Sequence, residues 1–232
     1  MVIAIINLQE LDCIKQKIHE SVIKAKRHTS DVHIIAVTKT LQFEAIQSAY
    51  DNNINIIGEN RVQEASDKLL NQTVPPHSEL HLIGHLQSNK INKAIQIFDV
   101  IQTIDSLKLA KKVNLACQKL NKCQRVYIQI NSGNDPAKYG FKMHDVLDAA
   151  QEINNFSNLS LEGVMMIPPF IEIDNYYRSI FQQTKEMQLN IYNSGISSCI
   201  NVSMGMSRDY QLAIEEGATH IRIGTALFGS RH

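Results

Sequence analysis

The stretch VHIIAVTK (residues 32–39) is a short run of apolar, mostly β-branched residues that ends in a lysine. Runs of this kind are typical of strands that are buried on both faces, as in a parallel sheet. Further runs of the same character follow along the chain, each separated from the next by a longer segment. They lie at residues 55–60, 80–85, 98–104, 125–131, 161–167, 199–203 and 220–224. The chain is therefore predicted to contain eight strands.

The segments between these runs have the period of amphipathic helices. Leu109, Val113, Ala116 and Leu120 form an apolar stripe after Ser106, a residue type suited to cap a helix. Comparable stripes lie in residues 45–50, 62–69, 173–191 and, before the first strand, 11–25. This alternation predicts an α/β fold with a single (β/α)8 TIM barrel spanning residues 1–232 and an extra helical segment in residues 1–30. An open, doubly wound sheet is the alternative.

Little of the sequence follows the eighth run, so the last helix of such a barrel is expected to be short. We expect the N-terminal helix to cover the side that this short helix leaves open.

The composition is that of an ordinary globular protein. Of 232 residues, 44% are hydrophobic and 20% charged, and 23 basic residues balance 23 acidic ones. This balance argues against a nucleic-acid surface and an anionic-membrane partner. The N-terminal residues lack the basic start of a secretory signal, and the four cysteines form no Cys-x-x-Cys pair. We expect a cytoplasmic protein whose cysteines are reduced thiols in the core.

Lys39 is the most informative polar residue, because functional groups of (β/α)8 barrels lie at the carboxyl ends of the strands. It ends the run, separated by one residue from the apolar residues 34–37. Burial lowers the affinity of an amine for its proton, and the neutral amine is the form that attacks a carbonyl. Lys39 is therefore a candidate Schiff-base lysine. A side chain that turns into solvent is the alternative.

Small and hydroxyl-bearing residues follow the last two runs: Ser203, Gly205 and Ser207, then Gly224 and Thr225. Glycine lets backbone N–H groups approach an anion, and serine or threonine adds a hydroxyl donor. Barrels of this class often bind phosphate at these two loops. A phosphate site is predicted here, with ordinary tight turns as the alternative.

Three further features allow two interpretations each. Arg222 lies inside the eighth run and needs either a ligand atom or a barrel carboxylate such as Glu162 as its partner. His81 and His85 are four residues apart, but in a strand, so no zinc site is expected. The loop of residues 138–141 is either a cover for the site or an exposed turn.

Five motifs, in order along the chain, resemble those of the pyridoxal-phosphate homeostasis proteins of the YggS/PROSC type. The resemblance covers nearly the whole chain from Ile34 onward. The motifs are AVTKT (36–40), GENRVQE (58–64), HLIGHLQSNK (81–90), SMGMSRD (203–209) and RIGTALFG (222–229).

This resemblance implies a barrel like the N-terminal domain of alanine racemase, with pyridoxal 5'-phosphate bound as a Schiff base to Lys39. Arg222 would face the pyridine nitrogen and Asn60 would lie beside the ring. The phosphate would be held by the residues of the last two loops, Ser203, Gly205, Ser207, Gly224 and Thr225. Arg61 replaces an aromatic residue that is usual in the family, and Ala137 and Lys138 belong to a less usual version of its fifth-strand loop.

The function implied is a carrier of pyridoxal phosphate that serves vitamin B6 and amino-acid homeostasis, without catalytic turnover. An arginine at the pyridine nitrogen disfavours protonation there, which makes the ring a weak electron sink. Racemases with this arrangement add a second base, usually from another domain, and we expect no such domain here. A pyridoxal-phosphate-dependent racemase and a sugar-phosphate enzyme remain alternatives, and transfer of the cofactor to apoenzymes stays open.

Overall fold

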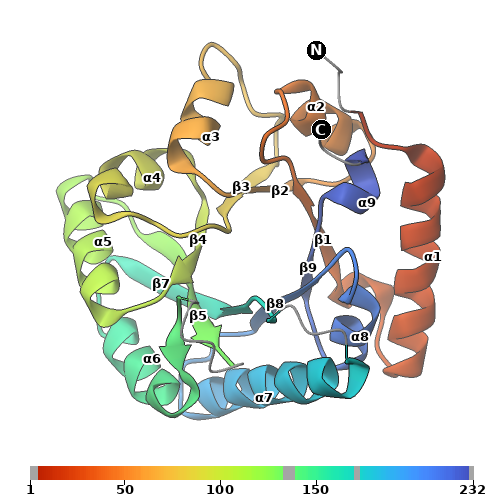
Figure 1. Cartoon of the computed structure of the whole chain (residues 1–232). Coiled ribbons are helices and arrows are strands. Elements are labelled where there is room, and N and C mark those ends of the chain that lie inside the picture. Colours follow the sequence, from red (N-terminus) through yellow and green to blue (C-terminus); the bar gives the residue numbers. More distant parts are fainter. Residues whose placement is uncertain (1–4, 133–138, 170–172, 230–232) are drawn as a thin grey trace.

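The computed structural model describes residues 5–132, 139–169 and 173–229, whose strands form one parallel sheet that closes on itself (Figure 1). The order around the ring is β4-β3-β2-β1-β9-β8-β7-β5, and β4 pairs with β5. The ring strands are β1 (His33–Val37), β2 (Ile56–Glu59), β3 (Glu79–Leu82), β4 (Val100–Ile104), β5 (Gln124–Asn131), β7 (Leu159–Met166), β8 (Asn201–Met206) and β9 (His220–Ile223). Each overlaps a predicted run. The barrel prediction is confirmed, and the open sheet is wrong.

Two details of the sheet differ from the predicted strands. A short additional strand, β6 (Phe141–Lys142), lies at the end of the strand order and pairs with β5 in a segment that was expected to be a loop. Strand β8 begins later than its predicted run and continues to Met206, with a shift in its register against β9 after Ser203. Ser203 therefore lies within a strand and not at its end.

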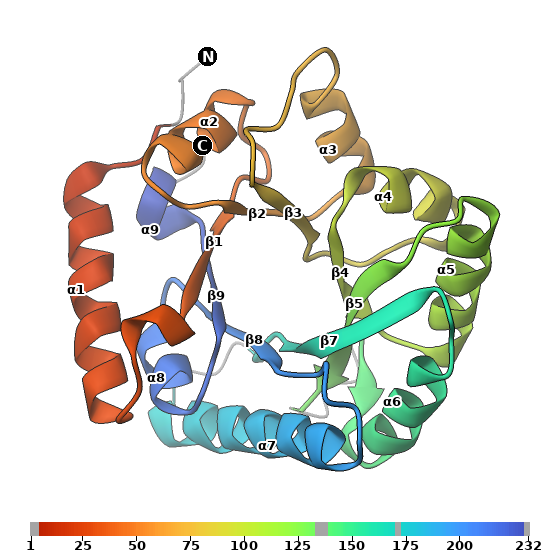
Figure 2. The ribbon, with the colours of Figure 1, turned by 180° about the vertical axis from the view of Figure 1, so that it is seen from behind.

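The helices surround the ring and cover the outer face of the strands (Figures 1 and 2). Ser106 caps α5, the helix that carries the predicted apolar stripe, since its hydroxyl accepts a hydrogen bond from the Leu109 amide at 3.3 Å. The α-helices are α1 (Leu8–Lys24), α2 (Glu44–Asp51), α3 (Val62–Lys68), α4 (Ile91–Ile97), α5 (Leu107–Lys119), α6 (Val146–Asn154), α7 (Asp174–Asn193), α8 (Tyr210–Glu215) and α9 (Thr225–Phe228). Short 3-10 turns are η1 (Thr29–Asp31), η2 (Ser88–Lys90) and η3 (Met143–Asp145).

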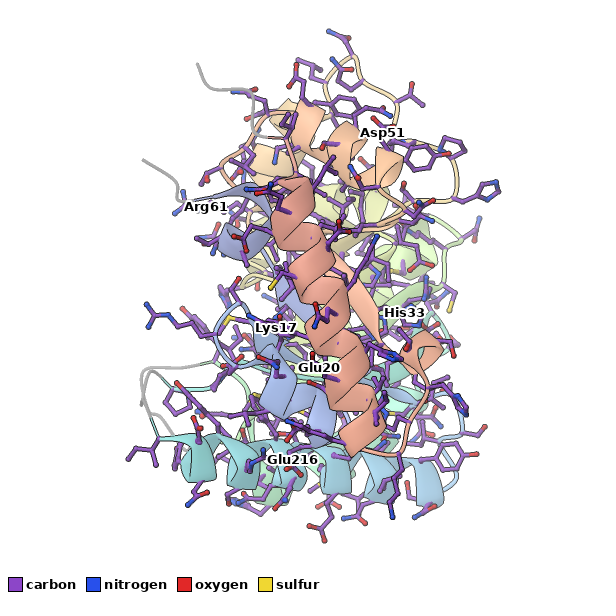
Figure 3. All side chains as sticks on the ribbon, turned by 90° about the vertical axis from the view of Figure 1, so that its right-hand side faces the viewer. Lys17, Glu20, His33, Asp51, Arg61 and Glu216 are labelled. Carbon is purple, nitrogen blue, oxygen red and sulfur yellow. The ribbon has the colours of Figure 1, made fainter. Side chains whose placement is uncertain are left out.

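Helix α1 lies along the side of the barrel where α8 and α9 are short, with the exposed Lys17 and Glu20 on it (Figure 3). It contacts both short helices. The amide of Asn7 donates to the carbonyl of Leu227 at 3.0 Å, which ties the start of α1 to α9. At the other end, the Arg27 guanidinium donates to two carbonyls that flank the end of α8. The expected role of the N-terminal helix is thus confirmed.

The interior of the barrel is polar as well as apolar. His81, Gln102, Ser203 and His220 are all buried there. The hydroxyl of Ser203 on β8 donates to Gln102 on β4 at 2.7 Å, and these strands are not neighbours, so the bond crosses the interior. Burial lowers the pKa of His220 to about 3, which leaves this imidazole neutral at physiological pH.

All four cysteines are free thiols, but only Cys117 and Cys199 are buried. The prediction of core thiols is wrong for Cys13 and Cys123. Cys13 lies on an exposed position of α1, and Cys123 precedes β5 in the turn that enters it. Among the helices of the described ranges, none combines the length and apolar character needed to span a bilayer.

Candidate functional site

A cavity of about 740 Å³ opens at the carboxyl ends of the strands. Its lining comes from nearly every strand of the ring, which is the usual place for the functional site of this fold. Most of the predicted site residues line it, namely Lys39, Asn60, Ser207, Arg222, Gly224 and Thr225. The structure thus brings together residues that lie as much as 186 positions apart (39 to 225).

Lys39 lies two residues after the end of β1, partly buried in the cavity wall. The preceding residue, Thr38, is fully buried, and its hydroxyl donates to the Glu59 carboxylate at 2.6 Å. The Lys68 ammonium donates to the Thr38 carbonyl at 2.7 Å and also forms an ion pair with Glu59. On the other side, the Thr40 amide donates to the Glu64 carboxylate. The backbone on both sides of Lys39 is therefore held in place.

The Glu59–Lys68 ion pair is buried, with side chains that are 1% and 4% exposed. Desolvation raises the pKa of Glu59, and the neighbouring Lys68 ammonium opposes that rise. Glu64 lies one helical turn before Lys68 on α3, and its carboxylate is also within 3.7 Å of the Lys68 ammonium. The buried contact to Glu59 was not predicted, because β2 and α3 come together only in the folded chain.

The opposite wall of the cavity comes from the ends of β8 and β9. Gly205 has φ +87°, and a Cβ atom there would lie 2.6 Å from the Cβ of Ala213. A residue with a side chain would therefore clash with α8, so glycine allows α8 to pack directly on the end of β8. This packing sets the position of Ser207. The Met206 amide donates to the buried Asp209 carboxylate at 2.5 Å, which fixes the turn between strand and helix.

Arg222 lies on β9 and is 4% exposed. Its guanidinium donates to the Ser203 hydroxyl at 2.8 Å and to the Met166 carbonyl at 2.7 Å. Burial lowers the pKa of Arg222 to about 10, so the group is still a cation at neutral pH. The alternative partner, Glu162, is wrong, because this carboxylate accepts a hydrogen bond from Arg125 at 2.8 Å.

Comparison with known proteins identifies the family. The family model of the alanine racemase N-terminal domain matches residues 14–232. The pyridoxal phosphate homeostasis protein of Pasteurella multocida is 35% identical over 96% of this chain and 97% of its own. That of Helicobacter pylori is 34% identical over 95% and 97%. The chain belongs to the pyridoxal phosphate homeostasis protein family. The family resemblance of the five motifs is confirmed.

Solved structures agree with this family. PipY of Synechococcus elongatus, solved with PLP bound, has a TM-score of 0.80 and 32% identity, covering 91% of this chain and 100% of its own. An alanine racemase of Clostridium difficile has a TM-score of 0.74 at 18% identity, covering 93% of this chain and 57% of its own. The second likeness concerns the fold, which is the barrel expected from the sequence.

Two of the predicted site residues of this family member lie elsewhere. Among the described residues, neither Ser203 nor Gly205 lines the cavity. Ser203 is fully buried within β8, and its hydroxyl contacts Gln102 and Arg222. Arg61, which replaces a usual aromatic residue, is exposed and is likewise not part of the lining.

Sequence reasoning missed an aromatic pair at the rim of the cavity. The rings of His85 and Tyr139 stack with centroids 3.9 Å apart and planes 14° apart. Nδ1 of His85 lies 3.1 Å from the Asp105 carboxylate, and Gln129 donates to the Tyr139 carbonyl at 3.0 Å. Tyr139 belongs to the loop that was interpreted either as a cover for the site or as an exposed turn, and it lines the cavity. Ala137 and Lys138 fall outside the described residues.

His85 belongs to the motif HLIGHLQSNK, but neither its stacking on Tyr139 nor its contact with Asp105 was predicted. No group of three or more histidine, cysteine and acidic residues suited to hold a metal occurs in the described part of the chain. The adjacent Gly84 packs against the site instead: a Cβ atom there would lie 2.2 Å from the Asn60 carbonyl oxygen. The close contact of these two backbones positions Asn60 in the cavity wall, and the glycine in the motif was the available signal.

Proposed function

We propose that this chain binds pyridoxal 5'-phosphate in the cavity, as a Schiff base on Lys39, and acts in vitamin B6 and amino-acid homeostasis without catalytic turnover. One observation carries the proposal: a lysine amine and a buried arginine line the same cavity. The family supports it, since its members are named for pyridoxal phosphate homeostasis and PipY was solved with PLP bound.

The residues of the cavity fit this cofactor. Pyridoxal phosphate is a flat aromatic aldehyde with an anionic phosphate, and its aldehyde condenses with a primary amine, with loss of water, to form a coloured Schiff base. Lys39 offers the amine, while Ser207 and Thr225 offer hydroxyl donors for the phosphate. Arg222 offers a buried cation for the ring nitrogen. A volume of about 740 Å³ is in the range of small-molecule sites.

Each side chain has a distinct role in this proposal. Lys39 supplies the nucleophile, from a backbone that the Lys68–Glu59 pair holds. Ser207, Gly224 and Thr225 bind the phosphate, and Asn60 lies beside the ring. Arg222 donates a hydrogen bond toward the pyridine nitrogen and, being cationic, disfavours a proton on that nitrogen. The ring is then a weak electron sink, which supports retention without turnover.

The Schiff base is tested by reducing the purified protein with borohydride in the presence of pyridoxal phosphate, followed by peptide mass spectrometry. We expect a pyridoxyl adduct on Lys39 and none in Lys39→Ala, which should also lose the yellow colour. Lys112→Ala, at an exposed lysine outside the cavity lining, is the matched control and should keep both. An adduct on another lysine, or sustained formation of D-isomers from single L-amino acids, would contradict the proposal.

Three broader points belong to the same proposal. Residues 1–232 act as a single domain, supported by one hydrophobic cluster that extends from Ile6 to Leu227. The protein works in the cytoplasm, supported by its four free thiols.

The cofactor passes to pyridoxal-phosphate-dependent apoenzymes, supported by the exposed lining residues His85 and Thr225 at the mouth of the cavity. Mixing the loaded protein with such an apoenzyme and following the gain of its activity tests this transfer.

A further inference from the structure

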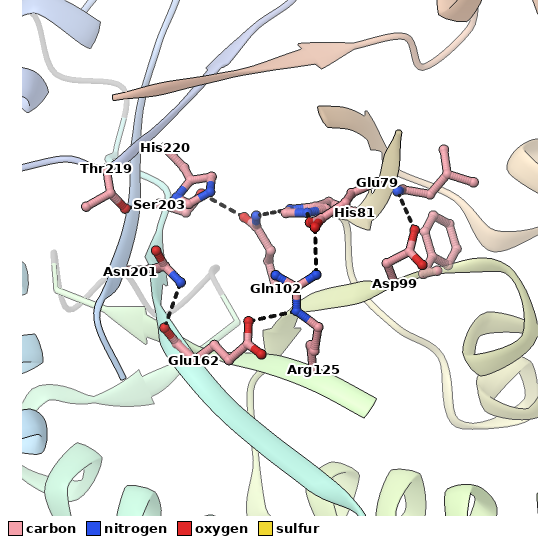
Figure 4. A network of polar contacts seen from close by, with 12 residues as sticks. Glu79, His81, Asp99, Gln102, Arg125, Glu162, Asn201, Ser203, Thr219 and His220 are labelled. Carbon is pink, nitrogen blue, oxygen red and sulfur yellow. Dashed lines mark hydrogen bonds and ion pairs between the residues drawn. The ribbon is translucent and has the colours of Figure 1, made fainter. Parts of the chain in front are cut away.

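Arg222 is connected to the far side of the barrel by a chain of hydrogen bonds, most of which Figure 4 shows. Ser203 accepts from Arg222 at 2.8 Å and donates to the Gln102 side-chain oxygen at 2.7 Å. The Gln102 amide nitrogen lies 2.8 Å from Nδ1 of His81. Nε2 of His81 lies 3.0 Å from the Glu79 carboxylate. We call these five side chains the interior network.

The directions of the hydrogen bonds from Glu79 to Ser203 follow from the Glu79 carboxylate, while the Arg222 guanidinium can only donate. The hydrogen bond from His81, together with Arg125, lowers the pKa of Glu79 to about 2, so its carboxylate only accepts. Nε2 of His81 must therefore carry a proton. Burial lowers the pKa of His81 and keeps the imidazole neutral, which leaves Nδ1 as an acceptor.

This tautomer determines the remaining donors. Nδ1 of His81 accepts, so the group of Gln102 that faces it is the NH₂. The carbonyl oxygen of Gln102 then faces Ser203 and accepts its only hydroxyl proton. The Ser203 oxygen consequently presents a lone pair to the Arg222 guanidinium.

We propose that Gln102 is a positioning residue for the cofactor site: through Ser203 it holds the Arg222 guanidinium in the orientation that faces the pyridine nitrogen. The proposal rests on the proposed function for the identity of the ligand. It also assigns Ser203 to the ring side of the site, because its proton is donated to Gln102 and is not available to a phosphate.

The orientation matters because Arg222 is a cation with little access to water. Its acceptors among the described residues are the Ser203 hydroxyl and the Met166 carbonyl. Without Gln102, the proton of the Ser203 hydroxyl loses its acceptor, so the side chain is free to change rotamer and turn its oxygen away from the guanidinium. The guanidinium then loses one of its acceptors and shifts relative to the ring.

The test compares Gln102→Leu with Gln188→Leu. The matched control, Gln188, is 2% exposed and donates to the Cys199 carbonyl at 2.6 Å, outside the interior network. In Gln102→Leu we expect a shifted absorption band of the bound cofactor and about five- to tenfold weaker retention, as for one lost hydrogen bond. In Gln188→Leu we expect lower stability but the wild-type band and affinity. Wild-type behaviour of Gln102→Leu, or the same shift in both variants, would overturn the proposal.

A second pair of variants separates the ring from the phosphate and does not depend on the folding of Gln102→Leu. Ser203→Ala should weaken the binding of pyridoxal and of pyridoxal phosphate by the same factor, because Arg222 acts on the ring that both share. Ser207→Ala should weaken only the phosphate form. A Ser203→Ala variant that discriminates against the phosphate form would show that Ser203 serves the phosphate, contrary to the proposal.

A third measurement needs no cofactor. Nitrogen-15 NMR of the histidine side chains at about pH 7 should show His81 as the neutral Nε2–H tautomer, with the signal assigned by its loss in His81→Asn. An imidazolium or an Nδ1–H tautomer would reverse the donors and overturn the proposal.

If wild-type protein binds no cofactor, the proposed function fails. If it binds on Lys39 but both Gln102→Leu and Ser203→Ala behave as wild type, only the positioning role fails.

Discussion

At the scale of single residues, the chemistry of a side chain depends on which hydrogen bonds its neighbours leave to it. Ser203 and Ser207 are both serines of one short motif, but only Ser207 lines the cavity. Ser203 is fully buried, with its hydroxyl engaged by Gln102 and Arg222. Arg222 in turn is a buried cation whose hydrogen-bond partners, within the part of the chain that the structure describes, are neutral oxygens. Such a group is costly to bury without a function.

Replacing Arg222 by methionine tests its place in the site. We expect Arg222→Met to retain pyridoxal phosphate about ten- to a hundredfold more weakly, because a hydrogen bond from a charged group contributes roughly 1.5–3 kcal/mol. The absorption band should shift as well, because the proposed function places the lost charge beside the ring. Equilibrium dialysis and absorption spectra measure both effects. Arg61→Met, at an exposed position outside the lining, should leave both unchanged. Equal effects in the two variants would place Arg222 away from the cofactor.

At the scale of elements, β1, β2 and α3 act together to place Lys39. Lys68 at the end of α3 contacts both the Thr38 carbonyl on the β1 side and the Glu59 carboxylate on β2. The ion pair is buried, so its contribution to the stability of the fold depends on both partners being present. Removing one of them leaves a buried charge without compensation.

Replacing Lys68 by methionine should destabilise the protein by about 3–5 kcal/mol, because Glu59 then remains buried without its cation. Desolvation already raises the pKa of Glu59, and losing Lys68 raises it further. A carboxyl group with a raised pKa in the folded state stabilises the fold at low pH, and that contribution is lost as the pH rises through the folded-state pKa. The loss of stability should therefore be smaller at low pH than at neutral pH.

Urea unfolding across this pH range measures the effect. The control is Lys24→Met, which removes the exposed ion pair with Glu215 and should cost at most about 1 kcal/mol. The double variant Glu59→Gln, Lys68→Met should recover part of the lost stability, since no buried charge remains. A cost for Lys68→Met that does not depend on pH would argue against the buried Glu59 as its cause.

At the scale of the whole molecule, the barrel depends on a helix that precedes the repeating pattern. The final helix, α9, covers only Thr225–Phe228, and α1 packs beside it and α8. Leu11 of α1 belongs to the same hydrophobic cluster as residues of the barrel strands. Helix α1 is thus part of the barrel core and not an appendage.

A matched pair of leucines on α1 tests this role. Leu11 is 2% exposed and Leu8 is 60% exposed. We expect Leu11→Ala to lower the free energy of unfolding by about 2–5 kcal/mol, with one cooperative transition, because it opens a cavity in the shared core. Leu8→Ala should change it by less than about 0.5 kcal/mol. If Leu11→Ala costs no more than Leu8→Ala in chemical denaturation, α1 is not part of that core.

The barrel could be predicted because its signals are local. Each ring strand is buried on both faces, so it appears in the sequence as an apolar run, as VHIIAVTK does around β1. The strand boundaries depend also on contacts in space: β8 continues past its apolar run through Gly205, whose close contact with Ala213 depends on α8. Similarly, Cys13 was expected to be buried, but it lies on the exposed face of α1.

The sequence by itself determined the order of strands and helices, the family, and the motifs that hold six of the residues lining the cavity, Lys39, Asn60, Ser207, Arg222, Gly224 and Thr225. Motif and periodicity depend on neighbours along the chain, which the sequence contains directly. Only the tertiary structure decided which residues form hydrogen bonds and stacking contacts with the side chains of the site. Gln102 of β4 meets Ser203 of β8, and His85 stacks on Tyr139, because closing the barrel brings distant strands together. Hydrogen-bond direction and burial depend on such contacts in space, so they could not be predicted from spacing along the chain.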